Sequence, residues 1–177
     1  MKRNVICRFL LSLCSSLFVI PVIPSNPVLA GTWCTHGGAY SLVGDFNGDA
    51  VPDILCTDYT GGKWIKYGFN GAEWSIRNNW CTHTGARVYV GDFNKDGRSD
   101  LLCHDRTGGK WIAYANSSGN FGDFNIGWST FSLWCTHPGS VLSINDYNHD
   151  GRDDLACTDN SPLTWVVYAN PSGTLNF

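Results

Sequence analysis

The chain has 177 residues, of which 43% are hydrophobic and 14% aromatic, and its formal net charge at pH 7 is −3. A slightly acidic chain lacks the positive surface that binding to a phosphate backbone requires, so nucleic acid is excluded as an expected partner. The apolar run near the start is short and is interrupted by prolines, which favours a cleaved segment over an uncleaved membrane anchor, so no membrane span is expected in the mature chain.

Residues 1–30 have the pattern of a secretory signal peptide. Lys2 and Arg3 form a charged start, an apolar run extends from Phe9 to Ile23, and Val28-Leu29-Ala30 ends at a cleavage site. Removal of this segment takes away three basic residues and no acidic ones, so the formal charge goes from −3 to −6. We therefore predict that residues 31–177 form a secreted, extracellular protein.

The mature chain keeps an even number of cysteines, which in an exported protein predicts disulfides. The partners of a pair in Cys34–Cys56, Cys81–Cys103 and Cys135–Cys157 are always 22 residues apart, whereas joining one repeat to the next gives unequal gaps. The equal spacing favours these three pairings.

An internal repeat organises the chain. Trp-Cys-Thr-His occurs at 33–36, 80–83 and 134–137, with periods of 47 and 54 residues. We divide the chain into repeats at about 33–79, 80–133 and 134–177. In each repeat an apolar strand, an acidic loop and a second strand come first, and a third strand follows at 63–67, 110–114 or 164–168. A fourth strand is predicted at 73–76 and at 121–128, and no helix is predicted.

Each repeat contains a nine-residue acidic loop, at 45–53, 92–100 and 146–154. Oxygen side chains stand at positions 1, 3, 5 and 9, and a backbone carbonyl at position 7 adds a fifth donor, which is a set of ligands that suits Ca²⁺. The predicted ligands are Asp45, Asn47, Asp49, Val51, Asp53, Asp92, Asn94, Asp96, Arg98, Asp100, Asp146, Asn148, Asp150, Arg152 and Asp154.

An EF-hand and an ordinary turn are the two other interpretations of these loops. An EF-hand requires Glu at position 12 and flanking helices, whereas position 12 here is Cys56, Cys103 or Cys157 and the flanks resemble strands. Ordinary Asp and Asn turns explain one such loop. Three copies with their carboxylates in register favour Ca²⁺.

Four short strands in a period of about 50 residues are typical of a β-propeller blade. We therefore expect an all-β fold of three four-stranded antiparallel blades, with the nearly continuous apolar first strands packed on both faces. Closed propellers have about four to eight blades. The expected forms are a fragment of a longer propeller with further blades, half of a dimeric six-bladed ring, or an open stack.

The loops resemble FG-GAP/VCBS repeats, the calcium-binding propeller blades of integrin α-subunit heads and many secreted proteins. The matching segments are Gly44–Asp49, Gly91–Gly97 and Asn145–Gly151, each followed by an Asp at position 9. The resemblance implies the fold and the ion, but not one particular activity. Ala50 departs from the pattern, because the other loops have Gly at this position, and a Cβ there predicts that loop one binds Ca²⁺ most weakly.

Other candidate sites carry competing interpretations. Zinc ligation by His36, His83 and His137 with nearby cysteines competes with a packing role in each blade. The eight tryptophans are candidates for sugar binding and for the core. Asn116-Ser117-Ser118 is either an N-glycosylation site or a polar turn.

No catalytic motif occurs, and Asp58, Asp105 and Asp159 are interpreted as turn residues, so we expect a protein that is not an enzyme. The expected function is a secreted calcium-binding module for adhesion or binding of an extracellular protein or glycan. A lectin and a non-catalytic module of a larger secreted enzyme are the alternatives.

Overall fold

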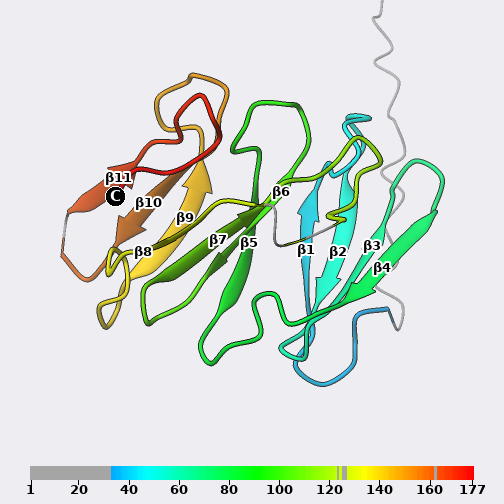
Figure 1. Ribbon diagram of the computed structural model, residues 1–177, viewed down its shortest axis with the longest axis horizontal. Helices are drawn as coiled ribbons and strands as arrows, with labels where there is room; N and C mark the ends of the chain where they lie inside the picture. The colour runs from blue at the N-terminus through cyan, green and yellow to red at the C-terminus, as the bar shows by residue number, and fades with distance from the viewer. Residues whose placement is uncertain (1–32, 123, 125–126, 162) are drawn as a thin grey trace, which may run out of the picture. The chain divides into compact units, whose positions relative to one another are not determined.

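The computed structural model describes residues 33–122, 124, 127–161 and 163–177, and the predicted signal peptide lies outside them. These residues form three antiparallel sheets, which Figure 1 shows one after another along the chain. In the described part of the chain there is no helix, and hence none that could cross a membrane. The prediction of an all-β fold is confirmed.

Each sheet is an up-and-down meander in sequence order, and we call the sheets blades one, two and three. Blade one consists of β1 (Tyr40–Gly44), β2 (Asp53–Thr57), β3 (Gly62–Lys66) and β4 (Glu73–Arg77). Blade two consists of β5 (Arg87–Gly91), β6 (Asp100–His104), β7 (Gly109–Ala113) and β8 (Ser129–Phe131). Blade three consists of β9 (Val141–Asn145), β10 (Asp154–Thr158) and β11 (Thr164–Val167). Instead of a fourth strand, a single bridge joins Ala169 and Leu175 beyond β11.

The predicted fourth strand of blade two is misplaced, because β8 begins at Ser129, after the segment predicted at 121–128. Phe121 and Phe124 are buried side chains of that segment, and they pack against aromatic rings of β4 and of the link that follows it. The ring centroids of Phe121 and Trp74 are 6.1 Å apart, and those of Phe124 and Trp80 are 4.9 Å apart. Aromatic packing between blades replaces strand pairing here.

The prediction that the first strands are buried on both faces is also wrong. Buried side chains instead dominate the second strands, where all five residues of β6 are buried. A second strand lies between two others in its sheet, and the neighbouring blades cover its faces. One apolar cluster joins Phe46 and Leu55 of blade one to Leu101 of blade two, and another joins Phe93 of blade two to Leu155 of blade three. The core therefore lies between the blades.

A reciprocal pair of hydrogen bonds, which we call the latch, joins each acidic loop to the next one. Between blades one and two, the Asp45 N–H donates to Ser99 Oγ (3.0 Å) and the Ser99 N–H donates to Asp45 O (2.7 Å). Between blades two and three, the Asp92 N–H donates to Asp153 Oδ2 (2.7 Å) and the Asp153 N–H donates to Asp92 O (2.8 Å). Position 1 of one loop thus always meets position 8 of the next.

The latch requires a close approach of the two backbones. A Cβ added to Gly44 would lie 2.8 Å from Ser99 Cβ, and one added to Gly91 would lie 3.0 Å from Asp153 Cβ. Such distances are too short for unstrained side chains, so the glycine before each loop is required by the contact. In blade three the corresponding residue is Asn145, and in blade one position 8 is Pro52.

The three predicted disulfides are confirmed. Cys34–Cys56, Cys81–Cys103 and Cys135–Cys157 each join the segment before a first strand to the following second strand, with 5.5 Å between the Cα atoms. Each bond closes a loop of 22 residues, which stabilises a small blade by on the order of 3 kcal/mol in the chain-entropy model.

Candidate calcium loops and an aromatic cleft

The acidic loops turn their oxygen atoms inward onto their own backbone. In loop one, Asp45 Oδ1 accepts the N–H of Asp49 (3.1 Å) and Asp45 Oδ2 accepts the N–H of Ala50 (2.8 Å). Asn47 Oδ1 also accepts the N–H of Asp49 (3.0 Å), and Asp49 Oδ1 accepts the N–H of Val51 (2.8 Å). The same bonds recur in loops two and three. The side chains at positions 1, 3 and 5 therefore all bond to the backbone of their own loop.

The aspartates at position 9 lie beneath the loops, and Asp53, Asp100 and Asp154 are each 0% exposed. Both oxygens of Asp100 accept backbone N–H groups, from Phe93 at 3.2 Å and from Ala115 at 2.9 Å. Burial raises the pKa of Asp100 to about 8, with the nearby carboxylates adding to the increase and the two N–H groups opposing it. This carboxyl group fastens the loop to the end of the third strand.

Position 7 distinguishes loop one from the other two. Arg98 donates its guanidinium to the Asp96 carboxylate, and Arg152 Nη2 donates to Asp150 Oδ2 at 2.5 Å. Loop one has Val51 at this position, so its Asp49 carboxylate has no guanidinium partner within the loop. In loops two and three an internal cation competes for the carboxylate at position 5.

Two positions in every loop have a left-handed backbone. Position 6 has φ of 62° at Ala50 and 80° at Gly97, which confirms that a glycine is favoured there. Position 4 also has positive φ, with 75° at Gly48, 61° at Lys95 and 60° at His149. Each loop therefore has one glycine and one strained residue with a Cβ at these two positions. Ala50 is thus no longer a reason to expect that loop one binds Ca²⁺ most weakly.

These contacts decide whether the loops fit Ca²⁺. Among the residues that the structure describes, no three His, Cys, Asp or Glu side chains form a ready metal-binding group. The side-chain oxygens of the loops nevertheless match the preference of Ca²⁺. An oxygen that accepts one hydrogen bond, such as Asp45 Oδ2, keeps a second lone pair, whereas Asp45 Oδ1 accepts two bonds, from Gly48 and Asp49. The donor set fits the ion, and the ligand assignments, including the carbonyls of Val51, Arg98 and Arg152, stay predictions.

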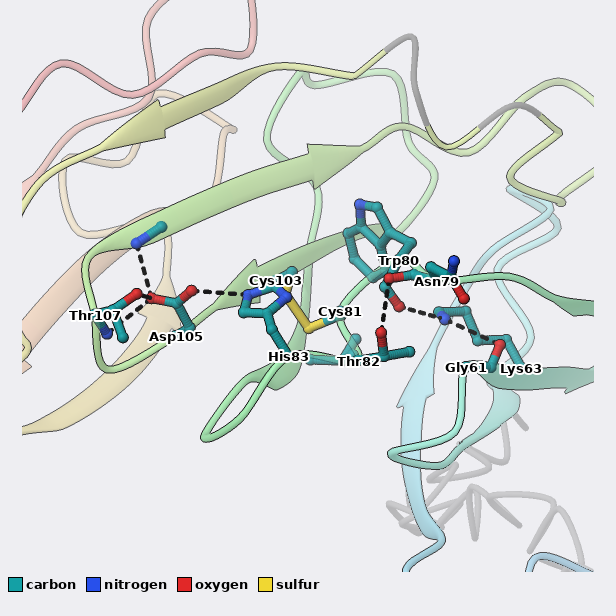
Figure 2. Close-up of a disulfide and its surroundings, with 12 residues drawn as sticks. Gly61, Lys63, Asn79, Trp80, Cys81, Thr82, His83, Cys103, Asp105 and Thr107 are labelled. Carbon is teal, nitrogen blue, oxygen red and sulfur yellow. Dashed lines mark hydrogen bonds and ion pairs between the residues drawn. A yellow bond between two sulfur atoms is a disulfide. The ribbon is translucent and has the colours of Figure 1, made fainter.

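The repeated histidines bind carboxylates rather than a metal shared with cysteine. His83 Nε2 lies 2.8 Å from Asp105 Oδ2, beside the Cys81–Cys103 disulfide (Figure 2). Asp105 also accepts the N–H groups of the turn that it begins, as predicted for a turn residue, and His36 and His137 repeat the contact at 3.1 Å. The cysteines are oxidised, so the zinc alternative loses its sulfur ligands.

A cleft of about 810 Å³, here called cleft one, lies at the junction of blades one and two. Its walls come from the end of β4, the following link, β7 and the start of β8. Its lining residues include Ile76, Asn78, Asn79, Trp80, His83, Trp111, Ile112, Trp128 and Ser129. The volume is within the range of about 300–1,000 Å³ that is usual for small-molecule sites.

Trp80 is held firmly at the edge of cleft one. Lys63 Nζ donates to the carbonyl of Trp80 at 2.9 Å and lies 5.3 Å from its ring centroid, and Figure 2 shows Lys63 reaching the link from below. Burial lowers the pKa of Lys63 to about 8, and Asp58 partly offsets this. Trp80 Nε1 is buried and has no hydrogen-bond partner within the described residues, and the Asn79 side chain is exposed.

Sequence reasoning missed cleft one because its walls come from three separated segments. One feature of the sequence could have indicated it, because the second repeat is longer than the first. Its additional residues come before β8, and Phe124 lines the cleft together with Trp80.

The Asn116 side chain forms a polar turn. Its Oδ1 accepts the N–H of Ser118 at 2.9 Å, and its Nδ2 donates to Asn120 Oδ1 at 2.6 Å. The turn interpretation is supported, and glycosylation stays a prediction.

Comparison with known proteins connects these features to a family. Residues 45–103 match the model of the FG-GAP-like repeat, which confirms the resemblance inferred from the loops. No curated protein matches. Among solved structures, a lectin from Agrocybe aegerita that recognises non-reducing terminal N-acetylglucosamine aligns with a TM-score of 0.60 and 20% identity. The alignment covers 78% of this chain and 37% of the lectin, so the chain spans little more than a third of the lectin's length.

Proposed function

We propose that this protein is a secreted, calcium-stabilised, non-catalytic binding module whose ligand is a glycan bound in cleft one. The observation that carries the proposal is the composition of that cleft. Trp80, Trp111 and Trp128 provide aromatic surface for the apolar face of a sugar ring, while the exposed side chain of Asn79 adds a polar group to the lining.

Secretion is supported by the three disulfides, which form and persist in oxidising compartments. The fold shared with a lectin supports the choice of a glycan, and it makes N-acetylglucosamine-terminated oligosaccharides the first probe.

Adhesion to an extracellular protein is the second candidate. It is favoured by exposed apolar side chains next to the second junction, where Phe131 is 70% exposed, Leu133 67% and Val141 61%. Apolar groups of this size are typical of protein-binding surfaces when they lie close together.

The test is calorimetric titration of residues 31–177 with an N-acetylglucosamine-terminated oligosaccharide, after a glycan array has defined the preferred terminal sugar. We expect Trp111→Ala to weaken binding at least about ten-fold, which corresponds to about 1.4 kcal/mol. Trp165→Ala is the matched control, because Trp165 has the same position in blade three and also lies edge-on to its histidine.

Trp165→Ala shows how the loss of an equivalent tryptophan outside cleft one affects binding. We expect its affinity for the oligosaccharide to equal that of the parent protein. Equal losses in both variants, or no binding to any glycan on the array, would contradict the proposal and would favour the protein ligand.

A further inference from the structure

A second cleft, here called cleft two, lies between blades two and three and has a volume of about 480 Å³. Arg87 and Tyr89 of β5 form one wall, with His104 at the end of β6 and Arg106 in the turn that follows. The opposite wall is the segment 135–142, which leads into β9.

At the equivalent place in the first junction, between blades one and two, aromatic rings stand instead of arginines. Tyr40 and Tyr59 occupy the positions that Arg87 and Arg106 occupy one repeat later, and their ring centroids are 6.0 Å apart. The Tyr40 hydroxyl also accepts the N–H of Val88 across the junction at 2.9 Å. Replacement of two tyrosines by two arginines therefore distinguishes the second junction from the first.

The positive charge in cleft two is not neutralised from within. Arg87 and Arg106 are exposed, and neither has an ion-pair partner among the residues that the structure describes. Asp105, next to Arg106 in the sequence, is already engaged with His83 at 2.8 Å, and Asp159, its equivalent in blade three, is engaged with His137 at 3.1 Å.

Both arginines act on one hydroxyl group. Burial raises the pKa of Tyr89, whereas the charges of Arg87 and Arg106 lower it, so the two guanidinium groups lie within electrostatic reach of the Tyr89 hydroxyl.

The backbone provides a further donor. Val88 and Leu142 have equivalent places in their strands, paired with Cys103 and Cys157 respectively. The Val88 N–H points across its junction to Tyr40, so the Leu142 N–H points into cleft two, where no described side chain accepts it. An oxygen atom of a ligand would take the place that the tyrosine hydroxyl has at the first junction.

We propose that cleft two binds the anionic group, a carboxylate or a sulfate, of an acidic saccharide. Arginine presents a planar set of donors that matches the oxygens of such groups, and two guanidinium groups with a backbone N–H and a hydroxyl hold an oxyanion from several sides. The saccharide part of this inference rests on the proposed function, whereas the anion site depends only on cleft two.

The test compares a sulfated and a uronic-acid oligosaccharide with a neutral one, by calorimetric titration of residues 31–177 at low and at physiological salt. The variant Arg87→Tyr/Arg106→Tyr installs the residues of the first junction. We expect it to weaken binding of at least one acidic probe about ten-fold or more and to leave the neutral probe unchanged. The control Lys66→Ala/Arg77→Ala removes two positive charges from blade one and should retain binding of the acidic probe.

The arms separate the possible results. If Arg87→Tyr/Arg106→Tyr weakens the binding of only the sulfated probe, or of only the uronic-acid probe, the result identifies which anionic group cleft two binds. Equal loss in the control pair means that net charge and not the cleft attracts the probe, and this overturns the inference, as does unchanged binding in the tyrosine variant. If the neutral probe binds and the acidic probes do not, the inference fails while the proposed function stands. Binding of acidic probes alone, lost in the tyrosine variant, supports cleft two and contradicts the proposal for cleft one.

Discussion

At the scale of single residues, the left-handed positions in the loops decide how much strain each loop holds. Ala50 has φ of 62°, a conformation that costs a residue with a Cβ about 1–2 kcal/mol and glycine very little. Replacing Ala50 by glycine would remove this cost. Glycine also makes the unfolded chain more flexible, which offsets roughly half of the stability gained.

We expect Ala50→Gly to stabilise the protein by up to about 1 kcal/mol, measured by denaturant unfolding. Gly48→Ala is the opposite control. Its φ is 75°, and an added Cβ would lie 3.2 Å from Arg98 Cγ, so this variant should be less stable than the parent. Destabilisation by Ala50→Gly would show that left-handed strain does not govern the loop.

Among the elements of the fold, the acidic loops are where bound Ca²⁺ should stabilise the folded state. An ion that binds only the folded state stabilises it by about 2.7 kcal/mol per site at a concentration of 100 times Kd. We therefore expect Ca²⁺ to raise the melting temperature of residues 31–177 and EDTA to lower it. Identical melting curves in Ca²⁺ and EDTA would mean that the loops are only turns.

The loops should also differ from one another. Arg98 pairs with Asp96, whereas Val51 leaves Asp49 without such a partner. We expect Arg98→Val to strengthen Ca²⁺ binding in loop two several-fold, because the competing charge is removed, as measured by calorimetric titration with Ca²⁺. Weaker or unchanged affinity would show that the guanidinium supports the loop rather than competing with the ion.

The elements also show how far the sequence could predict this structure. The equal spacing of the cysteines identified their partners, and the loop pattern located the turns between first and second strands, because both depend on local register that the repeat shows three times. The burial of β6 and the place of β8 depend on neighbouring blades, which no single repeat describes. The clefts could not be predicted either, because residues as distant as Asn79 and Trp128 meet there only after the blades have packed.

At the scale of the whole molecule, the latch decides whether blades can be added head to tail. A second copy whose blade one met blade three in the same way would place Pro52 against Asp146. Proline has neither the N–H nor the side-chain acceptor that Ser99 and Asp153 use, and the Asn145 Cβ would lie where the other junctions require glycine. A six-bladed ring of two copies is therefore disfavoured through this contact.

We expect residues 31–177 not to form a head-to-tail dimer, measured by light scattering over a wide range of concentration. The variant Pro52→Ser/Asn145→Gly restores both halves of the latch and should increase association at concentrations where the parent is monomeric. Pro52→Ser alone is the matched control, since the Asn145 side chain still blocks the approach. A parent dimer that either substitution weakens would contradict this interpretation.

Binding of a glycan in cleft one should be visible in the indole N–H signals of a nitrogen-proton correlation spectrum. The chain has eight tryptophans, each with one such signal. On titration with an N-acetylglucosamine-terminated oligosaccharide in the presence of Ca²⁺, the signals of Trp80, Trp111 and Trp128 should shift together, because these three rings line the cleft. The signals of Trp33 and Trp165 should stay in place. A spectrum in which the three cleft signals do not move, or in which the Trp165 signal moves as much as they do, would contradict the binding of a glycan in cleft one.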